Sequence, residues 1–126
     1  MILASLLFAL VAALLHVYIF TMESITWTKP ATWKRFSLTS QADAETTKPL
    51  AYNQGFYNLF LAIITLVGLA LMRSEHGIGS ALALAGTGSM LAAALVLVTH
   101  DRTMLRAALT QGTLPALAVL FLLLEL

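Results

Sequence analysis

The sequence contains no cysteine, which excludes a disulfide framework, a thiolate nucleophile and a metal site built on cysteine. Charge is also scarce, because 10% of the 126 residues are charged whereas 60% are hydrophobic. Soluble domains are about one quarter charged and about half apolar. A chain this short has too little interior to bury such an excess of apolar side chains. The composition therefore predicts a single domain, residues 1–126, that lies in a membrane.

Several functional motifs are missing as well. The sequence has no glycine-rich phosphate loop, no HExxH pair and no serine-nucleophile motif. Its three histidines are scattered along the chain, so we expect neither a metal site nor a cofactor. The basic residues are few and lie close to apolar segments, so we expect no nucleic-acid partner. The partners that remain are membrane lipids and a hydrophobic small molecule.

Long apolar runs are what the sequence does have. A bilayer core needs about 20 apolar residues of helix, and four windows qualify, at about residues 2–25, 50–72, 78–99 and 105–124. They must be helical because lipid offers no partner to backbone N–H and C=O groups. No Lys or Arg precedes the first window, which is also longer than the apolar core of a signal peptide, so we expect a retained span. The sequence thus predicts an all-α, polytopic membrane protein, a bundle of four transmembrane helices.

The basic residues predict the orientation of these spans. One basic residue, Arg73, lies in the second connection, and the other six lie in the first and third connections: Lys29, Lys34, Arg35, Lys48, Arg102 and Arg106. Cytoplasmic loops of membrane proteins carry an excess of Lys and Arg. We therefore expect the first and third connections in the cytoplasm and both termini outside. A multi-pass protein of the cell membrane follows, the inner membrane if the source is bacterial.

The first connection is longer than a simple link requires. Pro30 is suited to begin a short helix, with Trp33 and Phe36 on one face and basic residues beside them, which favours an amphipathic cytoplasmic segment at the membrane interface. Ser40 is a candidate N-cap, and Pro49 is expected to begin the second span. The connection is either a tether or a lid packed over a site, and we favour the lid.

Small residues recur every four positions along the third span: Ala81, Ala85, Ser89 and Ala93. In lipid, small residues at this spacing let helix backbones approach closely. The stripe favours close packing inside one bundle. The alternative is a homo-oligomer joined through the third span.

Polar side chains interrupt the apolar spans. In the first span, His16, Glu23 and Trp27 fall within about 40° of one helix face. In the fourth, Pro115 leaves the carbonyl of Gln111 without its helical partner. The second span begins with YNQGFYN, which supplies two pairs spaced four residues apart: Gln54 with Asn58, and Asn53 with Tyr57.

These polar groups are all expected in the cytoplasmic half of the bilayer, with His16 nearer the middle than Glu23. An ionisable side chain that faces lipid costs about 2.5–3.5 kcal/mol, so such groups face one another or a cavity. We therefore expect one buried polar site in which the acid, the histidine and the amides satisfy one another. A purely structural network is the competing interpretation.

Four segments together resemble the DUF1304 family of small integral membrane proteins: HVYIFTMESITWT, WKRFSLT, ETTKPLAYNQGFYNLFLA and QGTLPALAVL. The resemblance spans nearly the whole chain and implies a four-helix membrane protein, without implying an activity. The positions that match the family pattern are His16, Glu23, Trp27, Arg35, Phe36, Leu38, Asn53, Gln54, Gly55, Tyr57, Asn58, Gln111, Gly112 and Pro115.

The first functional hypothesis is a membrane-embedded protein that binds a hydrophobic small molecule and could isomerise it by proton transfer. Glu23 and His16 are the candidate catalytic residues. The candidate substrate-binding residues are Trp27, Asn53, Gln54, Tyr57, Asn58 and Gln111. Among them, the indole of Trp27 could hold a cationic species by its ring face. The combination of an acid, amides and an indole is similar to that of emopamil-binding-type sterol isomerases, by analogy of site only.

Two further hypotheses stay open at this point. A proton-coupled exporter would act as a dimer, but its site would be expected near the bilayer midplane. A structural or regulatory membrane subunit would use the same polar residues only to join helices.

Overall fold

The computed structural model describes residues 1–126 and contains helices and no strands. In chain order the elements are α1 (Ile2–Phe20), the π-helical turn η1 (Thr21–Ile25), α2 (Pro30–Trp33), the 3-10 turn η2 (Lys34–Phe36), α3 (Gln41–Leu71), α4 (His76–His100), the 3-10 turn η3 (Arg102–Met104) and α5 (Leu105–Leu124). Counted with their adjoining turns, four helices are long and apolar enough to cross a membrane. The predicted all-α, four-span architecture is therefore confirmed.

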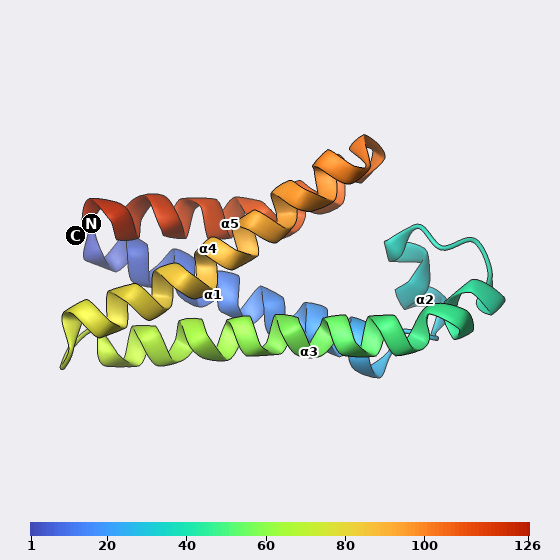
Figure 1. The fold of residues 1–126 in the computed structure, drawn as a ribbon, viewed down its shortest axis with the longest axis horizontal. Helices are drawn as coiled ribbons and strands as arrows, with labels where there is room; N and C mark the ends of the chain where they lie inside the picture. The colour runs from blue at the N-terminus through green and yellow to red at the C-terminus, as the bar shows by residue number, and fades with distance from the viewer.

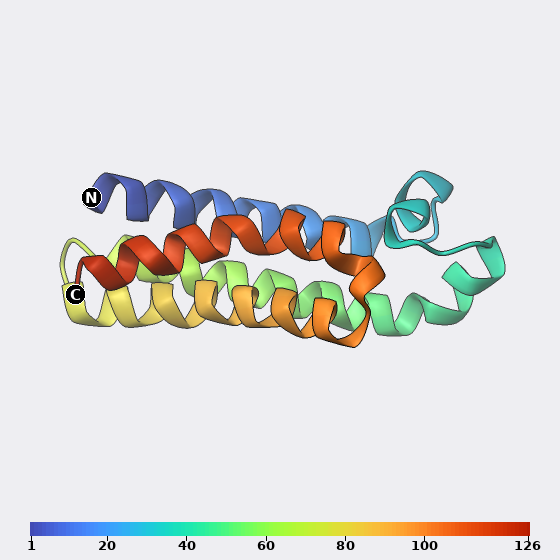
Figure 2. The same cartoon turned by 90° about the horizontal axis from the view of Figure 1, so that it is seen from above.

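The four long helices form a closed ring. Both termini lie at the end of the bundle that carries the α3–α4 turn, and the first and third connections lie toward the other end (Figures 1 and 2). Helix α1 packs against α3 and α5, and α4 packs against the same two helices, whereas α1 barely touches α4. Chain neighbours are therefore antiparallel, as short connections require.

The interior of this ring is built from small side chains. Its buried apolar residues are mostly alanines: Ala9, Ala12, Ala13, Ala44, Ala51, Ala62, Ala83, Ala94, Ala108 and Ala118. Large apolar side chains instead face outward, such as Leu14, Ile63 and Leu123, each about half exposed. A soluble protein does the reverse, because burial of leucine and isoleucine from water drives its folding. Small residues inside and large ones outside are typical of helices that pack in lipid.

Helix α3 begins earlier than the sequence predicted. It starts at Gln41, nine residues before the expected position, because Ser40 caps it and accepts a hydrogen bond from the backbone N–H of Asp43 at 3.1 Å. Pro49 lies inside the helix and so does not begin it, and its place at the start of the membrane span stays a prediction. Pro49 has no backbone N–H to donate to the carbonyl of Glu45. Because this part of the helix is exposed, water can hydrate that carbonyl instead. Thirty-one residues of helix extend about 46 Å, so the first turns project beyond a core about 30 Å thick.

The small-residue stripe expected to pack inside the bundle faces outward. Its members, Ala81, Ala85, Ser89 and Ala93, are all exposed, so this prediction was wrong. The residues that do pack inward from α4 are Gly79, Ala83, Gly86, Thr87, Met90 and Ala94. Ala81 and Ala85 lie two positions from Ala83, about 200° around the helix and so on the opposite face, whereas Ala93 lies next to Ala94 and lines the large cavity described below. A homo-oligomer through the outward stripe stays a prediction.

Gly86 is one of the positions at which α4 closely approaches α3. A Cβ atom at this position would collide with Thr65 Oγ1 and lie 3.1 Å from the carbonyl oxygen of Leu61. Gly88, on the same helix, has nothing within 4 Å of such a Cβ. We expect Gly86→Ala to lower the free energy of unfolding by about 1–2 kcal/mol through overpacking, and Gly88→Ala to leave it nearly unchanged. Denaturant titration in detergent micelles measures both, and equal stabilities would contradict the contact.

Candidate functional site

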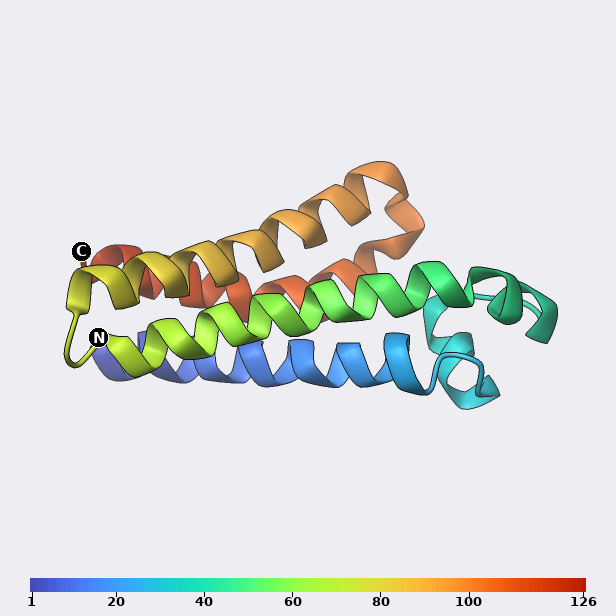
Figure 3. The ribbon, with the colours of Figure 1, turned by 60° about the horizontal axis from the view of Figure 1, so that its bottom comes forward.

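A cavity of about 1070 Å³ lies between the helices at the end of the bundle that carries the first connection. Helix α4 diverges from α3 toward its C-terminal end (Figure 3), and residues of both helices line the cavity. All four long helices and the first connection contribute to its wall. Five of the eight residues that the sequence proposed for a site line it: His16, Glu23, Gln54, Asn58 and Gln111. The structure therefore brings polar residues of three helices, α1, α3 and α5, to one space.

Glu23 occupies the middle of a π-helical turn. The backbone of Thr26 donates to the carbonyl of Thr21 at 3.0 Å, so this turn contains one residue more than an α-helical turn. Such π-helical turns are rare in proteins as a whole. Those that do occur are often found at functional sites. The Glu23 side chain is 8% exposed and lines the cavity. The wider turn therefore presents a carboxyl group to an enclosed space.

Asn58 fixes one oxygen of this carboxyl group. Its amide nitrogen donates to Glu23 Oε1 at 2.6 Å and to the carbonyl of Gln54 at 3.3 Å. Both partners are acceptors, so the NH₂ end of the Asn58 amide, and not its oxygen, must point toward them.

The second oxygen of Glu23 is free. Oε2 makes no hydrogen bond within the protein, and Ser80 Oγ is the only fully buried side-chain polar atom that lacks a partner. Oε2 is therefore reachable from the cavity. One oxygen is held in place while the other can exchange a proton or bind a ligand.

His16 presents a nitrogen to the same cavity. It is 2% exposed, and its Nδ1 lies 2.9 Å from the carbonyl oxygen of Ala12. Since a carbonyl only accepts, Nδ1 carries the hydrogen, and in the neutral ring Nε2 carries a lone pair. Nε2 makes no hydrogen bond within the protein and is not fully buried, and the His16 side chain lines the cavity. It is a second group that can exchange a proton.

His16 and Glu23 do not touch. They are seven residues apart on α1, which places them about 10 Å apart along the helix axis. Within the set of candidate site residues, Glu23 and Asn58 form the one hydrogen bond between side chains. The expected network of mutually satisfied side chains is therefore limited to this pair. The space between His16 and Glu23 is large enough for a ligand to contact both.

Gly55 allows α1 and α3 to meet beside this site. Ser24 Oγ donates to the carbonyl of Tyr52 at 2.9 Å. A Cβ atom on Gly55 would collide with that hydroxyl and lie 3.1 Å from the Cβ of Glu23. The glycine in the NQG block of the sequence is thus a close-approach position, and it sets the separation across which Asn58 reaches Glu23.

Trp27, Asn53 and Tyr57 do not line the cavity. The helix ends at Thr26, so Trp27 does not continue the helix face that carries Glu23. The indole N–H of Trp27 donates to Thr47 Oγ1 at 3.2 Å. Its ring packs on the ring of Phe36, with 4.8 Å between the centroids. Asn53 and Tyr57 are exposed on another face of α3. Adjacent positions are about 100° apart on a helix, so only one of the two polar pairs of α3 can face inward. The indole is therefore absent from the space that holds the acid and the amides.

The first connection packs over the cavity. Arg35, Phe36 and Ser37 line it, and Arg35 Nη1 donates to the hydroxyl of Tyr18 on α1 at 2.9 Å. The indole N–H of Trp33 donates to Gln41 Oε1 at 2.9 Å. These contacts favour the lid over the tether. Arg35 and Arg106 line the cavity but were not among the residues that the sequence proposed for a site.

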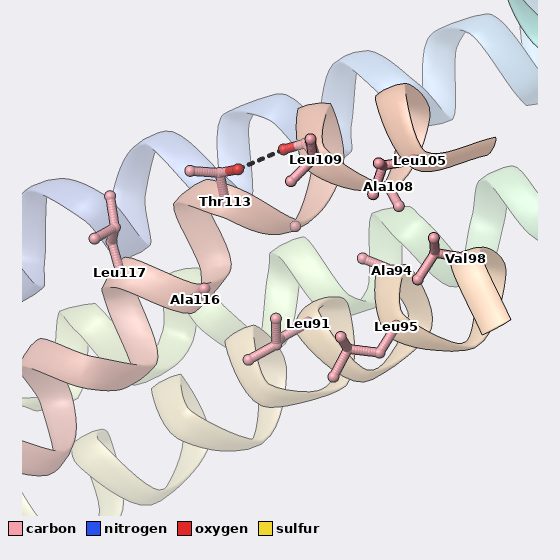
Figure 4. Close-up of a pocket in the computed structure, with 11 residues that line it drawn as sticks. Leu91, Ala94, Leu95, Val98, Leu105, Ala108, Leu109, Thr113, Ala116 and Leu117 are labelled. Carbon is pink, nitrogen blue, oxygen red and sulfur yellow. Dashed lines mark hydrogen bonds between the residues drawn. The ribbon is translucent and has the colours of Figure 1, made fainter. Parts of the chain in front are cut away.

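A smaller groove of about 310 Å³ lies between α4 and α5 (Figure 4). Its wall is apolar, with Leu95 and Val98 from α4 and Leu105 from α5. Its one hydroxyl, that of Thr113, already donates to the carbonyl of Leu109 at 2.6 Å. The groove therefore offers contact to an apolar chain and no group for chemistry.

Comparison with known proteins supports the architecture and adds no activity. Neither curated proteins nor solved structures contain a match to this chain. The family model described as "Protein of unknown function (DUF1304)" matches residues 10–123, a range that includes every residue lining the large cavity. The chain therefore belongs to the DUF1304 family.

Proposed function

We propose that this protein binds a hydrophobic small molecule in the large cavity and transfers protons to or from it. The observation that carries the proposal is that Glu23 Oε2 and His16 Nε2 are both free, both reachable from one cavity and about 10 Å apart along α1. Ionisable residues at membrane depth are costly and mark functional sites more often than structural ones.

The arrangement suits an isomerisation. Moving a double bond adds a proton at one carbon and removes a proton from another, so it needs an acid and a base. Each turnover moves one proton from the acid to the base, and exchange with water at the cavity returns that proton before the next turnover. Glu23 and His16, at two levels of one cavity, supply these two groups. The amides of Gln54 and Gln111 line the same space and are suited to orient a polar substituent of the ligand.

The proposed location is the cytoplasmic half of the cell membrane, in a bacterium the inner membrane. Six of the seven basic residues lie at the cavity end of the bundle, which favours this end in the cytoplasm. Gln54 and Val96 line the cavity and are exposed where α3 and α4 diverge. A ligand dissolved in the inner leaflet could therefore enter between these helices.

Binding with proton transfer is favoured over export. The other half of the bundle is closed by a packed core that includes Ala9, Met72, Ala83, Ala118 and Leu122. A transporter exposes its site alternately to the two sides of the membrane, which would require this half to open.

Substitution of Glu23 tests the proposal. The probe is a hydrophobic tertiary amine, whose positive charge mimics the cation formed when a double bond takes up a proton. We expect Glu23→Gln to weaken its binding about tenfold or more, a loss of about 1.4 kcal/mol, because the charge is gone while the amide oxygen still accepts from Asn58. Binding is measured by calorimetry in detergent micelles.

The control is Glu45→Gln, which makes the same change at an exposed site outside the cavity and should leave binding unchanged. A folded Glu23→Gln protein with undiminished affinity would favour the structural subunit. Proton-driven efflux from proteoliposomes would favour the exporter.

A further inference from the structure

Two guanidinium groups face the cavity without an acidic partner. Of the seven Lys and Arg residues, only Arg35 and Arg106 line it. Arg35 donates one hydrogen bond, to the hydroxyl of Tyr18, and the side chain of Arg106 donates none within the protein. Each guanidinium has five N–H donors in a planar fork that matches a carboxylate or a phosphate. Most of these donors have no partner within the protein, and because both side chains are exposed, water occupies them until a ligand displaces it.

The acids nearby do not satisfy these arginines. Glu23 is the only carboxylate that lines the cavity, and no Lys or Arg forms a salt bridge with it. Asp101 lies close to the start of α5, but it accepts from the backbone and the hydroxyl of Thr103, at 2.9 and 2.6 Å, and does not line the cavity. The hydrogen bond from the Thr103 side chain, with that from its backbone, holds the pKa of the exposed Asp101 carboxyl below its usual value. The cavity therefore carries two uncompensated positive charges.

Arg35 is held in position. Its bond to Tyr18 ties it to α1, and Trp33, two residues earlier, is tied to Gln41. Phe36, the next residue, packs on Trp27 at 4.8 Å between ring centroids. A guanidinium that is already placed loses less conformational entropy when it binds a ligand.

We propose that the ligand of this cavity is an amphiphile whose anionic group, a phosphate or a carboxylate, binds Arg35 and Arg106, while its apolar body extends toward Glu23 and His16. The inference rests on the proposed function and names the class of its ligand. Apolar side chains suited to that body line the same cavity, among them Leu15, Ile19 and Met22 of α1 and Val96 and Leu97 of α4.

The test compares probes that share one 18-carbon chain: oleyl phosphate, oleate and oleyl alcohol, with inorganic phosphate as the head group alone. Binding to the whole protein in neutral detergent micelles is measured by native mass spectrometry. We expect both anionic probes to bind about tenfold more tightly than the alcohol, as charge-assisted hydrogen bonds allow. Inorganic phosphate should not compete at comparable concentration.

Matched variants separate the cavity from the surface charge. Arg35→Gln combined with Arg106→Gln should bring oleyl phosphate to the affinity of oleyl alcohol. Lys34→Gln combined with Arg102→Gln removes the same charge from neighbouring positions that do not line the cavity, and should change the affinity by about twofold at most. Arg106→Gln alone removes no hydrogen bond within the protein, so it keeps the test valid if the lid loosens in the double variant.

Four results would overturn the inference. Equal losses in the two double variants would mean that general surface charge attracts the probe. Equal binding of the alcohol and the phosphate ester would mean that no anion site exists. Competition by inorganic phosphate at equal concentration would indicate a soluble anion. If no amphiphile binds, the alcohol and the tertiary amine included, the proposed function fails too. If the amine still binds in a Glu23-dependent way while the alcohol and the phosphate ester bind equally, this inference alone fails.

Discussion

Replacement of Gly55 by leucine is expected to lower the free energy of unfolding by about 3 kcal/mol or more and to abolish ligand binding. The new side chain would begin inside the contact between α3 and η1, where its Cβ would collide with Ser24 Oγ and lie 3.0 Å from the backbone nitrogen of Ser24. A backbone atom cannot rotate away as a side chain can. The two helices must then separate, and the expected loss in the free energy of unfolding lies at the upper end of the range usual for overpacking.

The same separation would disconnect the site. The hydrogen bond from Asn58 to Glu23 Oε1 is 2.6 Å long and joins the same two elements, α3 and η1. It would break if these elements moved apart by the width of a side chain. Unfolding is measured by denaturant titration in detergent micelles, and binding is measured with the tertiary amine.

The control is Gly77→Leu on α4, where nothing lies within 4 Å of an added Cβ. It should change stability by about 0.5 kcal/mol or less. A Gly55→Leu protein as stable as this control would show that α1 and α3 do not approach as described.

Replacement of Asn58 by leucine is expected to have the second largest effect. It removes the one hydrogen bond that Glu23 receives from another helix. Hydrogen bonds to charged groups contribute about 1.5–3 kcal/mol, and an unmet buried acceptor is costly in itself. We expect the free energy of unfolding to fall by that amount and the tertiary amine to bind more weakly, because Glu23 Oε1 is no longer held.

A double-mutant cycle isolates the pair. Asn58→Leu and Glu23→Leu, each of which removes the hydrogen bond, made singly and together, should show a coupling of about 1 kcal/mol or more, since residues in direct contact are not additive. Asn53→Leu is the matched control, because Asn53 lies five residues earlier on α3, is exposed and does not line the cavity. Strict additivity, or an equal effect of the control, would contradict a direct bond between Asn58 and Glu23.

The convergence of residues at the site was predictable in part. Depth in a bilayer follows from counting residues along each span, so His16, Glu23, Asn58 and Gln111 could be expected at the same end of the bundle from sequence alone, and all four line one cavity there. Rotation of each helix about its axis does not follow from counting. The pairs Gln54–Asn58 and Asn53–Tyr57 are equally polar, and only the packing of α3 against η1 at Gly55 decides which pair faces inward.

Trp27 shows the second limit of the sequence argument. The spacing of His16, Glu23 and Trp27 assumes an uninterrupted α-helix at about 100° per residue. The π-helical turn and the end of the helix at Thr26 break that assumption, and they send the indole toward Thr47 and Phe36. Such a turn has no strong local sequence signature, because tertiary packing decides whether the extra residue fits.

The number of spans, their helical form and the level of their polar side chains were determined by the amino-acid sequence itself, because lipid imposes length and apolarity on each segment independently of its neighbours. Which face of α4 packs, which pair of α3 meets Glu23, and that Arg35 and Arg106 share a cavity with it were decided only by the tertiary structure. These features depend on how the helices are rotated against one another, and close contacts between segments far apart in the chain, such as those at Gly55 and Gly86, set that rotation.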